Sequence, residues 1–353
     1  MSGIIGHTMY AVLAAKAVTA RRLPISGIIG KHWASYLAGA YLGCDIQTMP
    51  EAICEDTGTE VGYGTVPILK SPITGGKVRP WKLKLGNQDF TPREIHNQFY
   101  GRAHLVFGWV REDQNLMIPW DHLPEYMAMV IEDARELFGP GQRQLAYMLG
   151  TLVHIVSDCM IKSIRPGVDL NLVDGKYTPR NRPIQDLVTF HEIGRKELKM
   201  DWASILSDLA DTPIEQVQFH HMRVGKQQGK LGQFFRQGWE PQKQDLLQAV
   251  LKENRRYLKI YNSTILKEME LTQTTLGWDC HESLRTISGG LHYSEMVEVA
   301  AKSNFRHALW QMTSEIMKVF TQVVERSSVL RNLPDGNLPT WEELEKQWSK
   351  KSG

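Results

Sequence analysis

An apolar stretch of helical length, from Leu149 to Ile164, carries a histidine and an aspartate in its interior. His154 and Asp158 stand four residues apart, so on a helix both side chains leave the same face, about one turn from each other. A carboxylate and an imidazole are costly to bury unless they are hydrogen-bonded, paired or bound to a metal. The pair therefore indicates either a private His–Asp hydrogen bond or two ligands of one metal ion.

The composition is that of a folded soluble protein. The chain has 353 residues, of which 42% are hydrophobic, and this is enough to bury a sizeable core. Its formal net charge is only +2, with acidic and basic residues interspersed, so no field recruits nucleic acid or an anionic membrane. We therefore expect no stable nucleic-acid complex. The four cysteines are far apart and form no CxxC pair, which argues against a disulfide scaffold or a thiolate zinc knuckle.

One apolar segment, from Tyr10 to Val18, has some likeness to the core of a signal peptide. No positive charge precedes it, Lys16 interrupts it, and Arg21 and Arg22 follow where a cleavage site would stand. No uninterrupted apolar stretch reaches the roughly 20 residues that a bilayer crossing needs. We expect a cytoplasmic protein without a transmembrane segment, and the sequence gives no indication of its oligomeric state.

Hydrophobic residues recur at helical spacing through most of the chain, which predicts an all-α fold. A polar segment from about Gln47 to Phe90 interrupts the pattern, with short strands or a covering loop at Val66 to Leu69 and at Trp81 to Leu85. The capping box Thr91-Pro92-Arg93-Glu94 then starts a new helix. We expect helices over residues 7–19, 32–42, 91–110, 122–138, 142–163, 184–198, 202–209, 212–221, 241–271 and 295–330.

A second polar motif, His292-Tyr293-Ser294-Glu295, follows two glycines in the C-terminal half. Its H-x-x-E spacing is compatible with a metal site, and it is also the spacing of a helix cap. We favour the helix cap, because such caps are common at the start of amphipathic helices. A contribution of His292 to a site from the C-terminal half stays open.

Four short motifs follow one another in the first half of the chain. They are Gly6-His7, the small-residue segment from Ala38 to Asp45, Ala103-His104-Leu105, and His154-Ile155-Val156-Ser157-Asp158. In this order they resemble the motifs of the zinc-dependent phospholipase C family, whose helical fold is shared by the fungal single-strand-specific nucleases. The resemblance implies a phospholipase C-like helical core over residues 1–200. Residues 201–353 are then expected to form a helical C-terminal extension packed on that core.

The resemblance also implies a set of zinc ligands, each at the position of a family motif. These ligands are His7, Asp45, His104, His154 and Asp158. Nitrogen and oxygen ligands without thiolate are acceptable to zinc, and open positions for water would make the site catalytic. Asp45 is accordingly expected at the catalytic centre as well as at the metal.

The family's next motif, H-x-x-x-E, falls in this chain on His191 to Arg195, where arginine replaces the carboxylate. Because arginine cannot ligate a metal, the carboxylate would come from Glu192, Asp186 or Glu197, or it is missing. We expect His191 to be a further ligand or an acid/base, with Glu192 beside it as a catalytic residue. One or two zinc ions, or another divalent metal, are then expected instead of the family's three.

These observations favour a metal-dependent hydrolase acting on a phosphate ester, such as a phosphodiester or a phospholipid head group. The substrate would be a small molecule or a lipid. Two alternatives remain open. The same metal site would serve hydrolysis or elimination on a sugar or another polar metabolite, because a fold does not fix its chemistry. In the other alternative, the chain is a non-catalytic helical binding module.

Overall fold

The computed structural model describes residues 3–42, 49–62, 70–71, 74–95, 123–138, 142–161, 180–211, 244–275 and 277–331. Of the residues described, 69% are helical, as the apolar periodicity predicts. Three small antiparallel sheets accompany the helices in this part of the chain. The all-α prediction therefore holds for the body of the molecule and leaves out these short strands.

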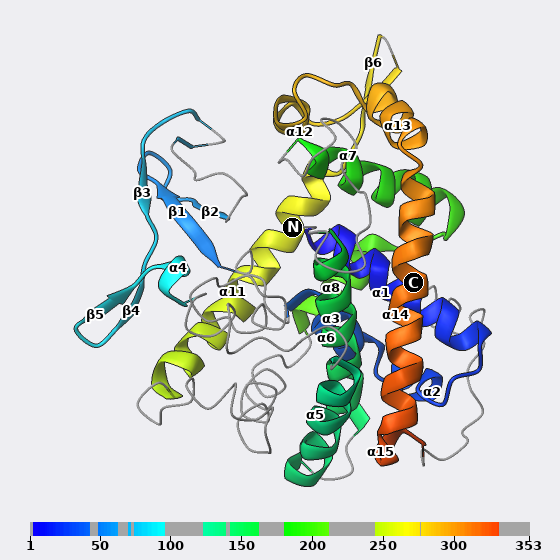
Figure 1. Ribbon diagram of the computed structural model, residues 1–353. Coiled ribbons are helices and arrows are strands. Elements are labelled where there is room, and N and C mark those ends of the chain that lie inside the picture. Colours follow the sequence, from blue (N-terminus) through cyan, green and yellow to red (C-terminus); the bar gives the residue numbers. More distant parts are fainter. Residues whose placement is uncertain are drawn as a thin grey trace.

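Helices α1, α3 and α6 lie at the centre of the molecule (Figure 1). The helices of the N-terminal half are α1 (Ile4–Ala20), α2 (Ser26–Lys31), α3 (Trp33–Leu42), α4 (Pro92–Ile95), α5 (Leu123–Phe138) and α6 (Gln142–Ile161). Most of α1 is buried on every side, which explains why its sequence lacks a polar face. Helix α6 contacts α1, α3 and α5, so the apolar stretch that carries His154 is an interior helix.

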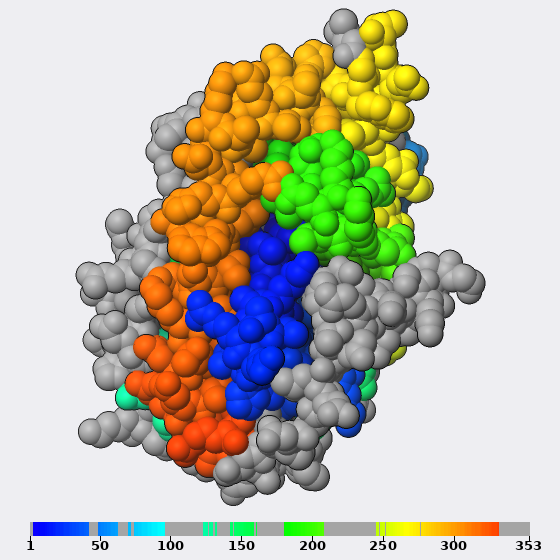
Figure 2. Space-filling view, turned by 90° about the vertical axis from the view of Figure 1, so that its right-hand side faces the viewer, coloured from blue at the N-terminus to red at the C-terminus, as the bar shows by residue number. Residues whose placement is uncertain are grey.

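The helices of the C-terminal half surround this centre. They are α7 (Asn181–Leu187), the π-helix η6 (Val188–Glu197), α8 (Trp202–Asp211), α11 (Gln244–Glu268), α12 (Glu282–Ile287), α13 (Tyr293–Lys302), α14 (Phe305–Arg326) and α15 (Ser328–Arg331). The long helix expected over residues 295–330 is broken before α14, where Asn304 is left-handed with φ 51°. In Figure 2 the blue N-terminal helices lie between orange α13–α14 and green α7.

The sheets are peripheral. The strands are β1 (Pro50–Cys54), β2 (Glu60–Gly62), β3 (Val78–Pro80), β4 (Leu83–Leu85), β5 (Gln88–Phe90), β6 (Thr272–Thr274) and β7 (Gly277–Asp279). Strand β1 pairs with both β2 and β3, whereas β4–β5 and β6–β7 are hairpins. Figure 1 places the first five strands beside α11, and Arg256 of α11 bonds Glu60 of β2 at 2.6 Å. Strand β4 confirms the strand expected near Leu85, and the one at 66–69 lies outside the described residues.

One hydrophobic cluster runs through the helical body, from Ile4 of α1 to Leu330 of α15. Residues on both sides of position 200 contribute to it, among them Leu152 of α6 and Phe320 of α14. The C-terminal helices therefore pack into the same core as the N-terminal ones, and a division at residue 200 stays a prediction. In the ranges that the structure describes, no helix has the length and hydropathy needed to cross a membrane.

The helix caps expected at Thr91 and at His292 are present. At the start of α4, the Thr91 backbone N–H donates to Glu94 at 2.7 Å, and the Glu94 N–H donates to the Thr91 hydroxyl at 3.3 Å. At the start of α13, the His292 backbone N–H donates to Glu295 at 2.8 Å. The H-x-x-E motif is therefore a helix cap. The His292 ring, in addition, bonds the Asp279 carboxylate at 2.6 Å.

Candidate metal centre

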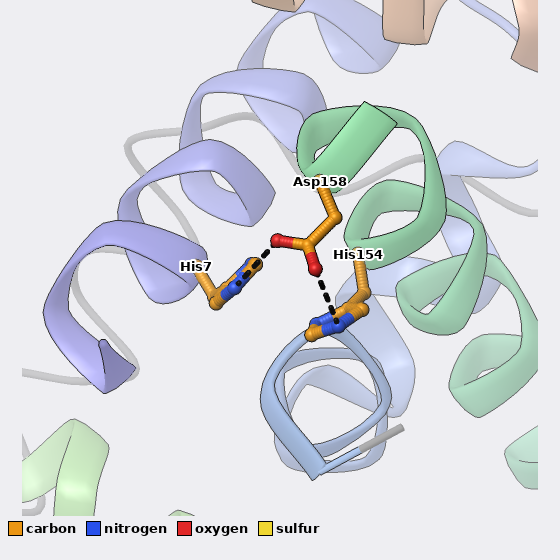
Figure 3. A group of neighbouring side chains, drawn as sticks. All are labelled: His7, His154 and Asp158. Atoms are coloured by element: carbon orange, nitrogen blue, oxygen red, sulfur yellow. Dashed lines mark ion pairs between the residues drawn. The ribbon is translucent and has the colours of Figure 1, made fainter. Parts of the chain in front are cut away.

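Three buried side chains from two helices meet at the centre of the molecule: His7 from α1, and His154 and Asp158 from α6. One ligand atom of each residue lies within 4.8 Å of the other two. The Asp158 carboxylate faces both imidazole rings, as Figure 3 shows. The distance from His7 Nε2 to Asp158 Oδ1 is 3.5 Å, and that from His154 Nε2 to Oδ2 is 3.8 Å. We call these three residues the central cluster.

Helical geometry accounts for the position of each member. His154 and Asp158 are one turn apart on α6, as their spacing predicts. His7 belongs to the first turns of α1, which packs against α6. The His7 and His154 rings stack with centroids 4.2 Å apart and an interplanar angle of 20°. Two protonated rings in this arrangement would repel each other, so the geometry favours at least one neutral imidazole.

The tautomer of His154 is set by helix α3. Its Nδ1 lies 2.7 Å from the backbone carbonyl oxygen of Ala40. A carbonyl oxygen can only accept, so Nδ1 carries the proton and donates it. In the neutral ring, Nε2 is then an acceptor, and its lone pair is on the side of the Asp158 carboxylate. In metal-binding histidines, the ring nitrogen that does not bind the metal usually donates its proton to a carbonyl or carboxylate oxygen.

The tautomer of His7 is set in the same way by Ser157. The Ser157 hydroxyl donates to the His154 carbonyl oxygen at 3.1 Å, which uses its only proton. Its oxygen lies 3.4 Å from His7 Nδ1 and can therefore only accept from that nitrogen. His7 Nε2 is left as the acceptor that faces Asp158. Both Nε2 atoms are thus available as acceptors within ion-pair distance of the Asp158 carboxylate.

This arrangement fits a cation better than a direct His–Asp hydrogen bond. Hydrogen bonds between nitrogen and oxygen measure about 2.7 to 3.2 Å, which is shorter than both separations in the central cluster. A tetrahedral zinc ion bound at about 2.0 to 2.1 Å separates neighbouring donor atoms by about 3.3 Å. The measured 3.5 and 3.8 Å are close to that spacing. The central cluster could therefore hold a metal ion.

His191 is not a member of the central cluster. Its Nε2 lies 2.7 Å from the Met269 carbonyl oxygen, and its ring meets the Tyr293 ring edge-on. Burial lowers the pKa of His191, and it outweighs the opposing effect of the Met269 hydrogen bond. His191 lies where the sequence resembles the family's H-x-x-x-E motif, and its Nε2 donates to this carbonyl. Among the described residues, the group that could hold a metal ion does not include His191, and its role as a further ligand or an acid/base stays a prediction.

Glu192 points to the C-terminal helices. Its carboxylate accepts from the Tyr293 hydroxyl at 2.5 Å and pairs with Lys196 at 2.7 Å. Burial opposes the charge on Glu192, but these two hydrogen bonds outweigh it and lower its pKa. A carboxylate that stays ionised and is held by Lys196 is poorly suited to act as a general acid.

The other two carboxylates considered as substitutes for the family's glutamate also have cationic partners. Asp186 pairs with Arg182 at 3.4 Å, and Glu197 pairs with Arg306. The Arg195 guanidinium lies 4.5 Å above the Phe190 ring. Within the part of the chain that the structure describes, none of these residues joins the central cluster. Asp45 and His104, the two remaining expected ligands, lie outside the described residues.

Two groups of the site were not expected from the sequence. Ser157 stands inside the H-x-x-x-D motif, and its place one turn after His154 was the only available sign of a role. The Ala40 carbonyl is a backbone group, which no residue type reveals. Comparison of the chain with models of protein families, with curated proteins and with solved structures gives no match.

Proposed function

We propose that this protein is a zinc-dependent hydrolase of phosphate esters, and that His7, His154 and Asp158 hold the metal. The observation that carries the proposal is that ligand atoms of two imidazoles and one carboxylate, all buried, lie within 4.8 Å of one another. Two imidazoles and a carboxylate are costly to bury together, and a bound cation offsets that cost. The substrate class rests on the resemblance of the motifs at His7, His154 and Asp158 to those of the phospholipase C family.

The ligand set is of the kind that catalytic zinc uses, with two imidazoles and one carboxylate. A zinc ion held here would lower the pKa of a coordinated water and offset charge on a phosphoryl oxygen. The contribution of the chain itself is to fix the tautomer and the position of the two histidine ligands. Ala40 and Ser157 keep Nδ1 of each ring protonated, and the packing of α1 on α6 keeps both rings next to Asp158.

A second candidate is a non-catalytic helical module in which the metal is structural. It is favoured by the burial of the ligands: His7, His154 and Asp158 are only 1%, 2% and 0% exposed. A substrate must reach a catalytic metal, whereas a structural metal is commonly enclosed. The two candidates share the metal site and differ in whether any turnover occurs.

The first test is metal analysis of the purified chain and of a His154→Ala/Asp158→Ala variant. We expect stoichiometric zinc in the natural chain and none in the variant. A His307→Ala variant is the matched control, because His307 is an exposed histidine of α14. Circular dichroism would show that all three proteins keep their helices. A natural chain without stoichiometric metal contradicts the proposal.

The second test is hydrolysis of bis(p-nitrophenyl) phosphate, with a p-nitrophenyl glycoside as the competing substrate class. We expect phosphodiester hydrolysis by the natural chain and by His307→Ala, and its loss in the double variant. Full activity in the double variant, or turnover of the glycoside alone, rejects a phosphate-ester hydrolase. Bound zinc without turnover of either substrate, together with a lower melting temperature in chelator, supports the structural metal.

A further inference from the structure

Helices α3 and α6 cross through two glycines that face each other's backbone. A Cβ atom built on Gly39 would lie 2.1 Å from the Tyr147 carbonyl oxygen of α6. A Cβ atom built on Gly150 would lie 1.9 Å from the Tyr36 carbonyl oxygen of α3 and 2.8 Å from the Ala40 nitrogen. Both contacts are with backbone atoms, which cannot relieve a clash by changing rotamer as a side chain can. The two helices are therefore closer here than any residue but glycine allows.

This crossing is one turn away from the central cluster. Gly150 and His154 are four residues apart on α6, so they share one face of the helix. Gly39 directly precedes Ala40, whose carbonyl oxygen accepts from His154 Nδ1 at 2.7 Å. The hydrogen bond that selects the ligating tautomer of His154 thus spans the same close crossing.

We propose that Gly39 and Gly150 are positioning residues of the metal site, because their lack of a side chain brings the Ala40 carbonyl within reach of His154. The inference rests on the proposed metal at His7, His154 and Asp158. An alternative is that the glycines serve only the packing of two interior helices. The two roles differ in what a methyl group at either position would do to the His154 ring.

The size of the expected displacement favours the positioning role. Ordinary van der Waals contact for a Cβ atom begins at 3.4 Å, so the helices would separate by about 1.3 to 1.5 Å to admit alanine. A separation of this size would lengthen the 2.7 Å bond between His154 and Ala40 to about 4 Å. The ring would then be free to take the other tautomer, in which Nε2 carries the proton and cannot bind a metal.

The experiment compares the natural chain with Gly150→Ala and Gly39→Ala. The matched control is Met312→Ala, which creates a cavity at a fully buried residue of α14, a helix that takes no part in the crossing. Zinc affinity is measured by competition with a chromophoric chelator. The tautomer of His154 is measured in metal-free protein from the nitrogen chemical shifts of its labelled imidazole. Denaturant unfolding of each protein separates loss of stability from loss of affinity.

We expect the natural chain to show the Nδ1–H tautomer at His154. Each glycine variant is expected to lose this preference and to bind zinc about 10- to 100-fold more weakly, the usual loss when a ligand's hydrogen-bond partner is removed. Met312→Ala is expected to be less stable and to keep both the tautomer and the affinity. A loss of affinity in Met312→Ala equal to that in Gly150→Ala would assign the effect to stability alone and overturn the proposal.

Two further outcomes contradict the positioning role. One is an Nε2–H tautomer of His154 in the metal-free natural chain. This measurement needs no variant, so it tests the proposal even if the alanine variants do not fold. The other is a folded Gly150→Ala protein with the natural tautomer and affinity. If the natural chain binds no zinc, the proposed function fails, while the tautomer of metal-free Gly150→Ala still tests the positioning by itself.

Discussion

His191 shows how burial and a backbone acceptor together determine the state of a single residue. Its ring is buried between η6, α13 and the end of α11, and Nε2 lies 2.7 Å from the Met269 carbonyl oxygen. Burial is the main cause that lowers the pKa of His191, and the nearby Arg195 acts in the same direction. The folded protein therefore favours the neutral ring, whereas the unfolded chain titrates near the ordinary value of about 6.5.

This difference predicts a loss of stability in mild acid. Because the folded-state pKa of His191 is the lower one, its neutral form supports the fold fully above about pH 6.5. As the pH falls below that value, the unfolded chain takes up the proton and the folded state loses stability. His191→Gln keeps an N–H donor for Met269 and cannot titrate. We expect the free energy of unfolding to fall less between about pH 7.5 and 5.5 in His191→Gln than in the natural chain.

Urea unfolding at the two pH values measures this effect. His307→Gln, which removes an exposed histidine of α14, controls for the substitution itself. An equal loss of unfolding free energy in His191→Gln and in the natural chain would contradict the assignment.

At the level of elements, the π-helix η6 is fixed by an aromatic contact with α8. The Phe190 ring stacks on Trp202 with centroids 5.1 Å apart, and Trp202 Nε1 donates to the Phe190 carbonyl oxygen at 3.1 Å. Gly194 lies against the same indole, because a Cβ atom built there would be 2.6 Å from Trp202 Nε1. The Gly194 carbonyl oxygen also accepts from the Met200 N–H at 2.9 Å. These contacts hold the segment from His191 to Arg195 against α8, and the His191 ring contacts Tyr293 of α13.

Gly194→Ala is expected to destabilise the protein. In an exposed helix the same change would stabilise by about 0.5 to 1 kcal/mol, because alanine is the better helix former. Here the added methyl group would push the Trp202 indole away, and such overpacking costs about 1 to 3 kcal/mol. Denaturant unfolding measures the change. A double variant with Trp202→Phe should recover part of the loss if the clash is the cause; a more stable Gly194→Ala protein would show that no clash exists.

On the scale of the whole molecule, the hydrophobic core extends from the first helix to the last one described. Phe320 of α14 is fully buried in this cluster, and α14 contacts α1, α5 and α6. The central cluster lies inside the same core, because His7 and Asp158 belong to helices that α14 packs against. The C-terminal helices and the helices that carry the central cluster are therefore expected to unfold together.

Phe320→Ala tests whether residues before and after position 200 unfold together. Truncation of a buried phenylalanine costs about 3 to 5 kcal/mol. Because the core is shared, we expect one thermal transition in the natural chain and one transition at lower temperature in the variant. Calorimetry measures both. Two separate transitions in the natural chain, with only one of them shifted in Phe320→Ala, would instead show that the C-terminal helices fold as a unit of their own.

The local features of this protein could be predicted from its amino-acid sequence. Helical periodicity predicts most of the helices that the structure describes, and the caps at Thr91 and His292 follow from spacings of three residues. The pairing of His154 with Asp158 was equally predictable, because a helix fixes which side chains share a face. All of these depend on residues within about one turn of each other.

Tertiary structure alone decided which of the candidate ligands meet. His7 joins His154 and Asp158 because α1 packs on α6, whereas His191, which lies in a similar motif, turns to Met269 and Tyr293. The acceptor that fixes the His154 tautomer is the Ala40 carbonyl, 114 residues away in the chain. Contacts between distant segments depend on how helices cross, and that is set by the packing of the whole core and not by local spacing.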